Sequence, residues 1–161
     1  MMEKTEFVTK DNVHEATNLE KIRSLMANAE RLGENEVVKR CKKRIFEIAG
    51  NEGETEIEIR LFQALAAYEE ILREKHNKAV RANYTKRKIK NKGVIQTLTD
   101  WALDKKVTPG FEALVSQGLE DFTGEKIVID FAEEFPVEVV DSASIKLKNV
   151  LEEIENEKLS D

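Results

Sequence analysis

The sequence contains few cysteine, proline, glycine and aromatic residues, and each shortage excludes a class of structure. Cys41 is the only cysteine among 161 residues, so neither an internal disulfide nor a zinc site built from thiolates can form. Only two prolines and seven glycines interrupt the chain, and aromatic residues make up 6% of it. A turn-rich β architecture usually needs more breaks of this kind, so the composition favours helices.

Long hydrophobic runs are also absent. No window approaches the roughly eighteen consecutive apolar residues of a membrane-spanning helix. The first residues lack the basic start, the apolar run and the small-residue cleavage site of a signal peptide. Together with the single cysteine, these absences predict a cytoplasmic protein.

Histidine and cysteine, which carry much of enzyme chemistry, are scarce. His14 and His76 are the only histidines, and with Cys41 they offer neither a recognisable Cys/His dyad nor a His-rich metal site. No glycine-rich segment leads into the lysine and hydroxyl residue of a phosphate-binding loop. We therefore expect a non-enzymatic binding protein that needs no metal or cofactor.

Two weaker catalytic patterns remain. Arg73 and His76 lie three residues apart near a predicted helix end, and a pair of this kind cuts RNA in some helical nucleases. Asp121 precedes Glu125 and Lys126 in the order of acid, acid and lysine that metal-dependent nucleases use. Both patterns lack the usual spacing, so we interpret these residues as charged helix faces.

Charge is abundant and unevenly distributed. Charged residues make up 36% of the chain, and the formal net charge is −6. Residues 73–92 contain nine Lys and Arg against one acid, a net charge of +8. Residues 120–161 contain thirteen acids against four lysines, a net charge of −9. The chain thus has a basic middle and an acidic C-terminal region.

The apolar periodicity predicts a helical hairpin over residues 17–50. Thr17 and Glu20 have the spacing of a capping box, and Gly33 is expected to end the first helix. The second helix follows after a very short turn and ends at Gly50. Helices joined so tightly must run nearly antiparallel.

Further helix starts are marked by hydroxyl residues. Thr55 and Glu58 again have capping-box spacing, before the helix that we expect at the centre of the core. Another helix follows Gly93. Thr108 and Pro109 supply the N-cap and the first position of the next helix.

The segment 123–135 is ambiguous. Ile127, Ile129 and Phe131 alternate as they would in a strand, yet Ile127, Phe131 and Phe135 also fit a helix capped by Thr123. We favour a helix, because a lone strand near 125–131 would have no pairing partner in a helical chain. Such a strand would pair only with its own copy in a homodimer.

The domain organisation follows from these patterns. Residues 1–15 lack periodicity and predict a flexible N-terminal arm. Residues 16–161 predict a single all-α domain of about seven helices, the last of which begins at Pro136. Cys41 lies on an apolar helix face, which indicates a buried cysteine and not a reactive thiolate.

The basic stretch is the part of the chain that suggests a function. Thr85 fits a helix N-cap, which would place Lys86, Arg87 and Lys88 in the first turn, where the helix dipole disfavours cations. A bound anion would remove this penalty, because free backbone N–H groups and clustered cations would both face it. We therefore expect a phosphate-rich ligand at this helix start.

We predict that the segment 81–92 binds nucleic acid, with DNA as the first candidate, although no residue distinguishes DNA from RNA. The cations would contact phosphates, and Tyr84 would stack on a base or form a hydrogen bond. The predicted interface comprises Arg81, Asn83, Tyr84, Thr85, Lys86, Arg87, Lys88, Lys90 and Lys92. The basic run 39–44 could extend this surface, but a solvated helix face is its simpler interpretation.

Two other interpretations stay open. The basic segment could be a solvated connection between two packed helices. Alternatively, the acidic region 120–161 could dock on a basic protein partner, or mimic nucleic acid as an inhibitor. Nucleic-acid binding at low salt would favour the basic segment, whereas copurification with a basic protein would favour the acidic region.

Overall fold

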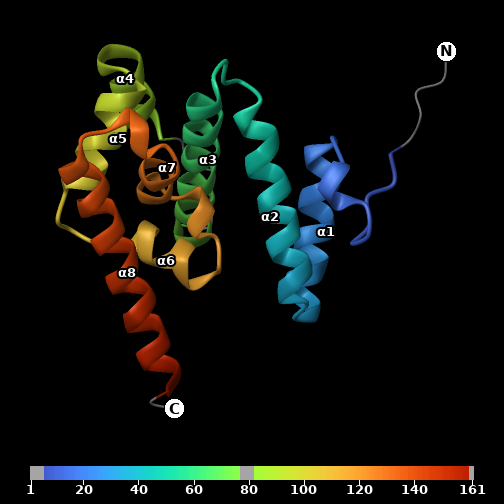
Figure 1. Ribbon diagram of the computed structural model, residues 1–161. Coiled ribbons are helices and arrows are strands. Elements are labelled where there is room, and N and C mark those ends of the chain that lie inside the picture. Colours follow the sequence, from blue (N-terminus) through green and yellow to red (C-terminus); the bar gives the residue numbers. More distant parts are fainter. Residues whose placement is uncertain (1–5, 77–81, 160–161) are drawn as a thin grey trace.

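The computed structural model describes residues 6–76 and 82–159, and within these ranges the protein is an all-α domain without strands (Figure 1). Its α-helices are α1 (Leu19–Leu32), α2 (Asn35–Gly50), α3 (Glu56–His76), α4 (Asn83–Lys92), α5 (Val94–Leu103), α6 (Pro109–Ser116), α7 (Gly124–Asp130) and α8 (Val137–Leu159). Three short 3₁₀-helices are η1 (Val13–Glu15), η2 (Glu120–Phe122) and η3 (Ala132–Glu134). The predicted all-α fold and its initial hairpin are confirmed.

The helical hairpin consists of α1 and α2. Asn18 caps α1 by accepting a hydrogen bond from the backbone N–H of Lys21 at 3.1 Å, so the predicted cap at Thr17 is wrong by one residue. Thr17 instead donates its N–H and its hydroxyl to the carboxylate of Glu6, at 2.9 and 2.7 Å. Gly33 ends α1 as predicted, with φ of 73° in the left-handed region that glycine adopts without steric cost.

The described part of the N-terminal segment, residues 6–15, packs against this hairpin. Val13 is fully buried in a core cluster with residues of α1 and α2. The carboxylate of Glu6 also accepts a hydrogen bond from the N–H of Asn18 at 3.0 Å, whereas Phe7 is largely exposed. Val13 therefore anchors this segment to the domain.

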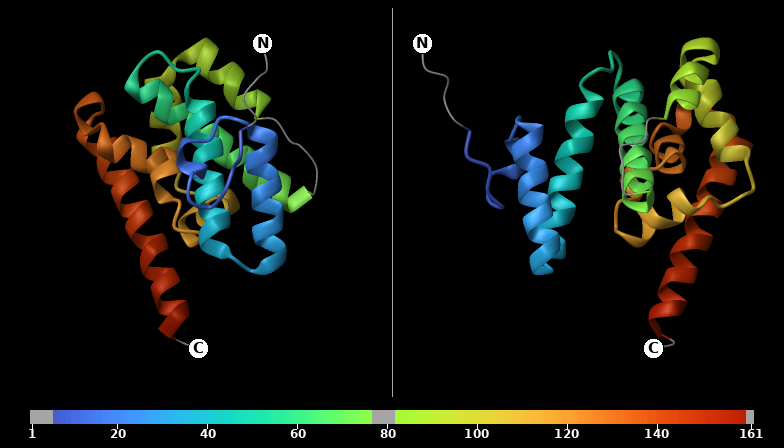
Figure 2. Two further views of the ribbon diagram at one scale, coloured as in Figure 1. Left: turned by 90° about the vertical axis from the view of Figure 1, so that its right-hand side faces the viewer. Right: turned by 180° about the vertical axis from the view of Figure 1, so that it is seen from behind.

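The central element is α3. Its predicted capping box is confirmed, because Thr55 Oγ1 accepts from the N–H of Glu58 and the carboxylate of Glu58 accepts from the N–H of Thr55, each at 3.2 Å. Ala67 belongs to the core cluster shared with the hairpin, whereas Leu61 and Ala64 belong to the cluster shared with α5, α7 and α8. Figures 1 and 2 show the hairpin on one side of α3 and the later helices on the other.

Two hydroxyl caps fix the short helices that follow. Thr108 accepts from the N–H of Phe111 at 3.1 Å with Pro109 in the first turn of α6, which confirms the predicted cap. Thr123 accepts from the N–H of Lys126 at 3.2 Å and begins α7. The ambiguous segment is thus helical where we favoured a helix. A homodimer that pairs strands near 125–131 is no longer supported, because this segment is not a strand.

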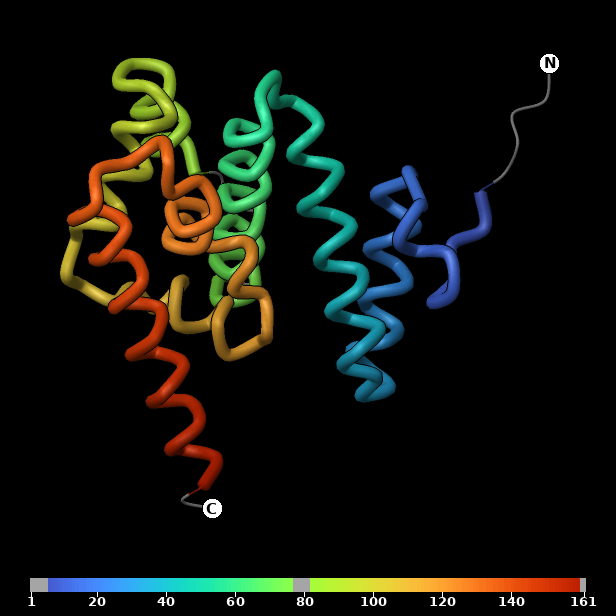
Figure 3. The backbone as a smooth tube through the Cα atoms, viewed as in Figure 1, coloured from blue at the N-terminus to red at the C-terminus, as the bar shows by residue number. Residues whose placement is uncertain are grey.

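The helices α7 and α8 complete the core cluster on the side of α3 that lies away from the hairpin. Figure 3 shows α7 nearly end-on between α3 and α8, and α7 contacts both helices. The C-terminal turns of α8 project beyond the other helices in every view (Figures 1 and 2). Within the described ranges, no helix combines the length and the hydropathy that crossing a membrane requires.

Candidate functional site

The helix α4 carries most of the predicted interface, and it begins two residues earlier than expected. Its N-cap is Ala82 and its first residue is Asn83, so Thr85 lies inside the first turn. The predicted N-cap at Thr85 is therefore wrong. Lys86 is consequently the fourth helical residue, and its backbone N–H donates to the carbonyl of Ala82 at 3.0 Å.

The negative group at the start of α4 comes from the protein itself. The carboxylate of Glu69, on α3, accepts a hydrogen bond from the N–H of Ala82 at 3.0 Å. The same carboxylate pairs with Nζ of Lys86 at 3.0 Å. A carboxylate at a helix N-terminus is stabilising because it compensates the helix dipole. No external anion is therefore needed to explain the cations at this helix start, contrary to our expectation from the sequence.

Lys88 faces the neighbouring helix α5. Its Nζ lies 2.7 Å from Oδ2 of Asp100, and its side chain is only 19% exposed. The hydrogen bond from Lys88 lowers the pKa of Asp100, and the charge of Lys92 acts in the same direction. Lys88 thus helps to hold α4 on α5, which leaves it less available to a ligand, whereas Lys92 is exposed at the end of α4.

The opposite face of α4 is open to solvent. Asn83, Lys86, Arg87 and Lys90 recur at the spacing of one helical face and line a shallow surface depression. Neither Arg87 nor Lys90 forms an ion pair with an acid in the described ranges. Tyr84 adjoins this face and is 76% exposed. We call these five residues the α4 face.

The predicted basic surface also included Arg81 and, as a possible extension, the run 39–44. Arg81 lies outside the described residues. The run 39–44 in α2 is engaged in contacts within the protein: Lys42 is buried and pairs with Glu74 at 2.5 Å, and Nε of Arg44 donates to a backbone carbonyl at 2.7 Å. These contacts favour a structural role for that run.

The residues of the two weaker catalytic patterns differ in burial or pair with other side chains. Asp121 is exposed and Glu125 is buried, while Lys126 pairs with an acid of its own helix at 3.0 Å. His76 is exposed at the end of α3, and Arg73 lies 3.9 Å from a neighbouring glutamate on the same helix. In the part of the chain that the structure describes, no three His, Cys, Asp or Glu residues are grouped to hold a metal ion.

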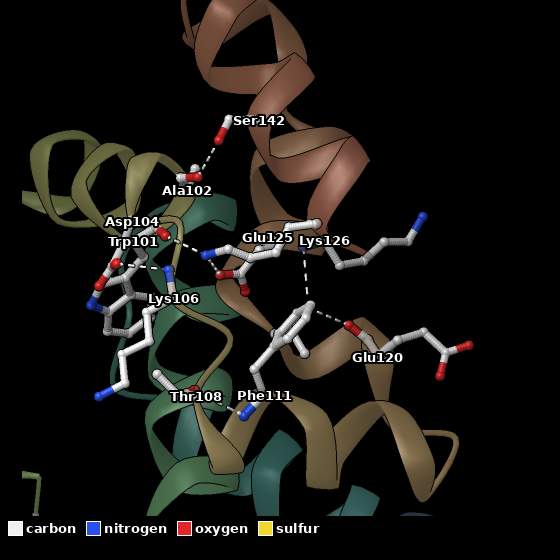
Figure 4. Close-up of polar contacts among 12 residues, drawn as sticks. Trp101, Ala102, Asp104, Lys106, Thr108, Phe111, Glu120, Glu125, Lys126 and Ser142 are labelled. Carbon is white, nitrogen blue, oxygen red and sulfur yellow. Dashed lines mark hydrogen bonds and ion pairs between the residues drawn. The ribbon is translucent and has the colours of Figure 1, made fainter. Parts of the chain in front are cut away.

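A second candidate site, which the sequence analysis did not identify, is a cleft of about 300 Å³ lined by residues of α3 to α8 (Figure 4). Three aromatic side chains line it: Trp101, Tyr68 and Phe111. The rings of Trp101 and Tyr68 meet edge to face, with centroids 5.6 Å apart. Gly124 permits this packing, because a Cβ at that position would overlap the ring of Trp101. Thr85 of α4 lines the cleft as well.

Glu125 and Lys146 form a buried ion pair in the wall of the cleft. Nζ of Lys146 lies 3.1 Å from Oε1 of Glu125 and donates to the backbone carbonyl of Trp101 at 2.8 Å. The two side chains are 5% and 9% exposed, and Oε2 of Glu125 is buried without a hydrogen-bond partner. Burial raises the pKa of Glu125, although the charge of Lys146 opposes this effect.

Sequence reasoning missed the cleft because its residues come from separate helices. Glu125 opens α7 and Lys146 lies within α8, so only the packing of these helices brings the two side chains together. One signal was nevertheless present. Lys146 lies three residues after Ala143 and next to Leu147, which places it beside apolar residues of the same helix face, and a lysine that is buried at such a position usually has a partner.

Cys41 is a core residue, as expected. It has no exposed surface and belongs to the same core cluster as Val13. Burial raises the pKa of its thiol to about 11, so little thiolate exists near neutral pH. Cys41 is therefore a packing residue of the core cluster that includes the hairpin, and its thiol is not a nucleophile near neutral pH.

Comparisons with family models, with curated proteins and with solved structures gave no match for this chain. The α4 face and the cleft are therefore interpreted from their own chemistry.

Proposed function

We propose that this protein binds nucleic acid through the α4 face and does not itself catalyse a reaction. The observation that carries the proposal is the alignment of Lys86, Arg87 and Lys90 on one solvent-exposed helical face, beside the exposed ring of Tyr84. Arg87 and Lys90 have no paired acid within the described ranges, so their charge is available to an external anion.

Each side chain of the α4 face has a role that suits a phosphate backbone. The guanidinium of Arg87 offers a planar fork of donors to two phosphate oxygens, and Lys90 offers a compact charge. The amide of Asn83 donates to phosphate or sugar oxygens, and the ring of Tyr84 stacks on an unpaired base. Lys86 contributes less than the sequence suggested, because Glu69 already pairs with it.

The number of available cations sets the salt dependence of binding. Nucleic-acid affinity falls with salt by a slope of about −0.7 to −0.9 per neutralised phosphate. Three contacts, from Lys86, Arg87 and Lys90, give a slope of about −2 to −3, or roughly a 20- to 40-fold loss of affinity between about 50 and 200 mM salt. This is a weaker dependence than the full basic stretch would produce.

The test is the fluorescence anisotropy of labelled oligonucleotides of about 20 nucleotides, as single-stranded DNA, duplex DNA and RNA, at two salt concentrations. In the variant Arg87→Glu with Lys90→Glu, we expect affinity to fall at least tenfold and the salt slope to decrease by about two. The matched control is Lys148→Glu with Lys158→Glu, which makes the same charge change in the distal part of α8.

Equal loss of affinity in both variants would show that net charge governs binding and would contradict a role for the α4 face. Absence of wild-type binding at the lower salt concentration would contradict the proposal altogether. Circular dichroism of each variant verifies that the helices are intact, because all four substituted residues are exposed on helix surfaces.

The acidic C-terminal region supports a second candidate function, docking on a basic protein. The projecting turns of α8 carry Glu152, Glu153, Glu155 and Glu157, and all four are exposed (Figure 1). A labelled lysine-rich peptide, measured in the same anisotropy assay, distinguishes the two functions. Binding of this peptide without binding of any oligonucleotide would favour the acidic region.

A further inference from the structure

We propose that the cleft between Trp101, Phe111 and Glu125 binds a small, flat, uncharged heteroaromatic molecule that donates an N–H to Glu125. This inference is independent of the α4 face, because it depends on interior side chains and not on exposed cations. Trp101, Phe111 and Glu125 come from α5, α6 and α7, and all three line the cleft (Figure 4).

The size and the walls of the cleft suit a flat aromatic ligand. Its volume of about 300 Å³ lies at the lower end of the range for small-molecule sites. Trp101, Tyr68 and Phe111 present ring surfaces, and Leu65 and Leu72 add apolar surface from α3. Aromatic walls favour an aromatic ligand, because rings gain from stacked or edge-to-face contacts beyond the burial of apolar area.

The unmatched oxygen of Glu125 specifies a hydrogen-bond donor on the ligand. Buried carboxylate oxygens are normally hydrogen-bonded, yet Oε2 of Glu125 has no partner, while Oε1 is held by Lys146. Glu125 lines the cleft, and the soft last torsion of a glutamate side chain would allow the small adjustment that pairs this oxygen with a donor on the ligand. An ionised carboxylate is an acceptor only, so its partner must donate.

The charges around the cleft favour an uncharged ligand. The ammonium of Lys146 balances the carboxylate of Glu125, and Lys106 balances Asp104 among the other lining residues. An anion would meet the carboxylate of Glu125, and a cation would meet the ammonium of Lys146. A neutral ring N–H satisfies the free oxygen without disturbing this balance.

Trp101 is the only tryptophan of the chain, so its indole N–H gives one side-chain signal that reports on the cleft in ¹⁵N NMR spectra. The probes are indole and benzofuran, flat molecules of nearly equal size that differ in the ring N–H donor. We expect indole to shift the Trp101 signal in a saturable way at up to about 10 mM, and benzofuran to bind at least tenfold more weakly.

Two variants locate the binding. Thr85→Phe places a ring in the cleft from α4 without disturbing the Glu125–Lys146 pair, and it should weaken indole binding at least tenfold. Its matched control, Asn91→Phe, adds the same ring at an exposed position of α4 and should leave the affinity unchanged. In the variant Glu125→Leu with Lys146→Met, the preference for indole over benzofuran should disappear.

Three outcomes would overturn the proposal. They are equal affinities for indole and benzofuran in the wild-type protein, the absence of saturable shifts at Trp101, and unchanged indole affinity in Thr85→Phe. None of these measurements involves the α4 face cations, so failure of nucleic-acid binding leaves this test intact.

Discussion

The ion pair of Glu125 and Lys146 depends on its full set of partners. Lys146 donates to Glu125 and to the carbonyl of Trp101, and its ammonium lies 5.9 Å from the ring centre of Phe111. Removing two charges from water costs several kcal/mol per ion, and attraction offsets this cost only when both partners are present. Loss of one partner should therefore cost more than loss of both.

We predict that Lys146→Met lowers the free energy of unfolding by about 3–5 kcal/mol near pH 7, because it leaves the carboxylate of Glu125 buried without a counter-ion. The variant Glu125→Leu with Lys146→Met should lose less than the single variant, because no charge stays buried. Urea unfolding of the three proteins measures these differences. A double variant less stable than Lys146→Met would contradict this account.

The same variant should show a defined pH dependence. Burial already raises the folded-state pKa of Glu125 above its ordinary value of 4.5, and removing Lys146 removes an influence that lowers it. The folded state then binds more protons than the unfolded state above pH 4.5, so stability falls as the pH rises through this window. The stability deficit of Lys146→Met should therefore shrink as the pH is lowered from about 7 toward 4.5, as urea unfolding at each pH would measure.

At the scale of the element, the hydroxyl caps show where local sequence is sufficient. The predicted caps at Thr55, Thr108 and Thr123 are confirmed, and each uses a partner three residues along the chain. The predicted caps at Thr17 and Thr85 are wrong. Carboxylates distant in sequence act at those two places: Glu6 accepts from Thr17 and Glu69 accepts at the start of α4.

This difference predicts two unequal effects on stability. Thr55→Ala should lower the free energy of unfolding by about 1 kcal/mol, because it removes the capping bond to the N–H of Glu58. Thr85→Ala should change it by less than about 0.5 kcal/mol, because Thr85 caps nothing and alanine favours the helix interior. Urea unfolding measures both values, and a larger loss in Thr85→Ala would contradict the assignment of Ala82 as the cap.

At the scale of the whole molecule, α3 joins the two halves of the core. Ala67 packs with the α1–α2 hairpin, while Leu61 and Ala64 pack with α5, α7 and α8. Opening of either half would therefore expose one apolar face of α3 to water, which couples the two halves. We expect the domain to unfold in a single cooperative transition.

Phe46→Ala tests this coupling. Phe46 has no exposed surface, and its ring packs edge to face on that of Phe122, with the ring centroids 5.1 Å apart. Phe46 belongs to the core cluster of the hairpin, whereas Trp101 packs against the other cluster. Its truncation should cost about 3–5 kcal/mol. Circular dichroism and Trp101 fluorescence should report the same lowered midpoint in urea. Non-coincident midpoints would show instead that the hairpin unfolds separately from the rest of the domain.

The charge asymmetry of the sequence is also an asymmetry in space. The basic helix α4 and the acidic last turns of α8 lie at opposite ends of the molecule in Figures 1 and 2. The sequence could predict the charge of each segment, because charge is a property of composition. It could not predict that Glu69 and Asp100, from α3 and α5, would pair with Lys86 and Lys88.

The sequence by itself determined the helices, because apolar spacing, hydroxyl caps and glycine stops act over three or four residues. These local signals located the hairpin, α3 and α6, and they favoured a helix at α7. Only the tertiary structure decided which cations of α4 stay exposed and which acid lies at its start. It also created the cleft, because residues of six helices line it and no local pattern predicts that they meet. The unpaired oxygen of Glu125 likewise depends on this packing.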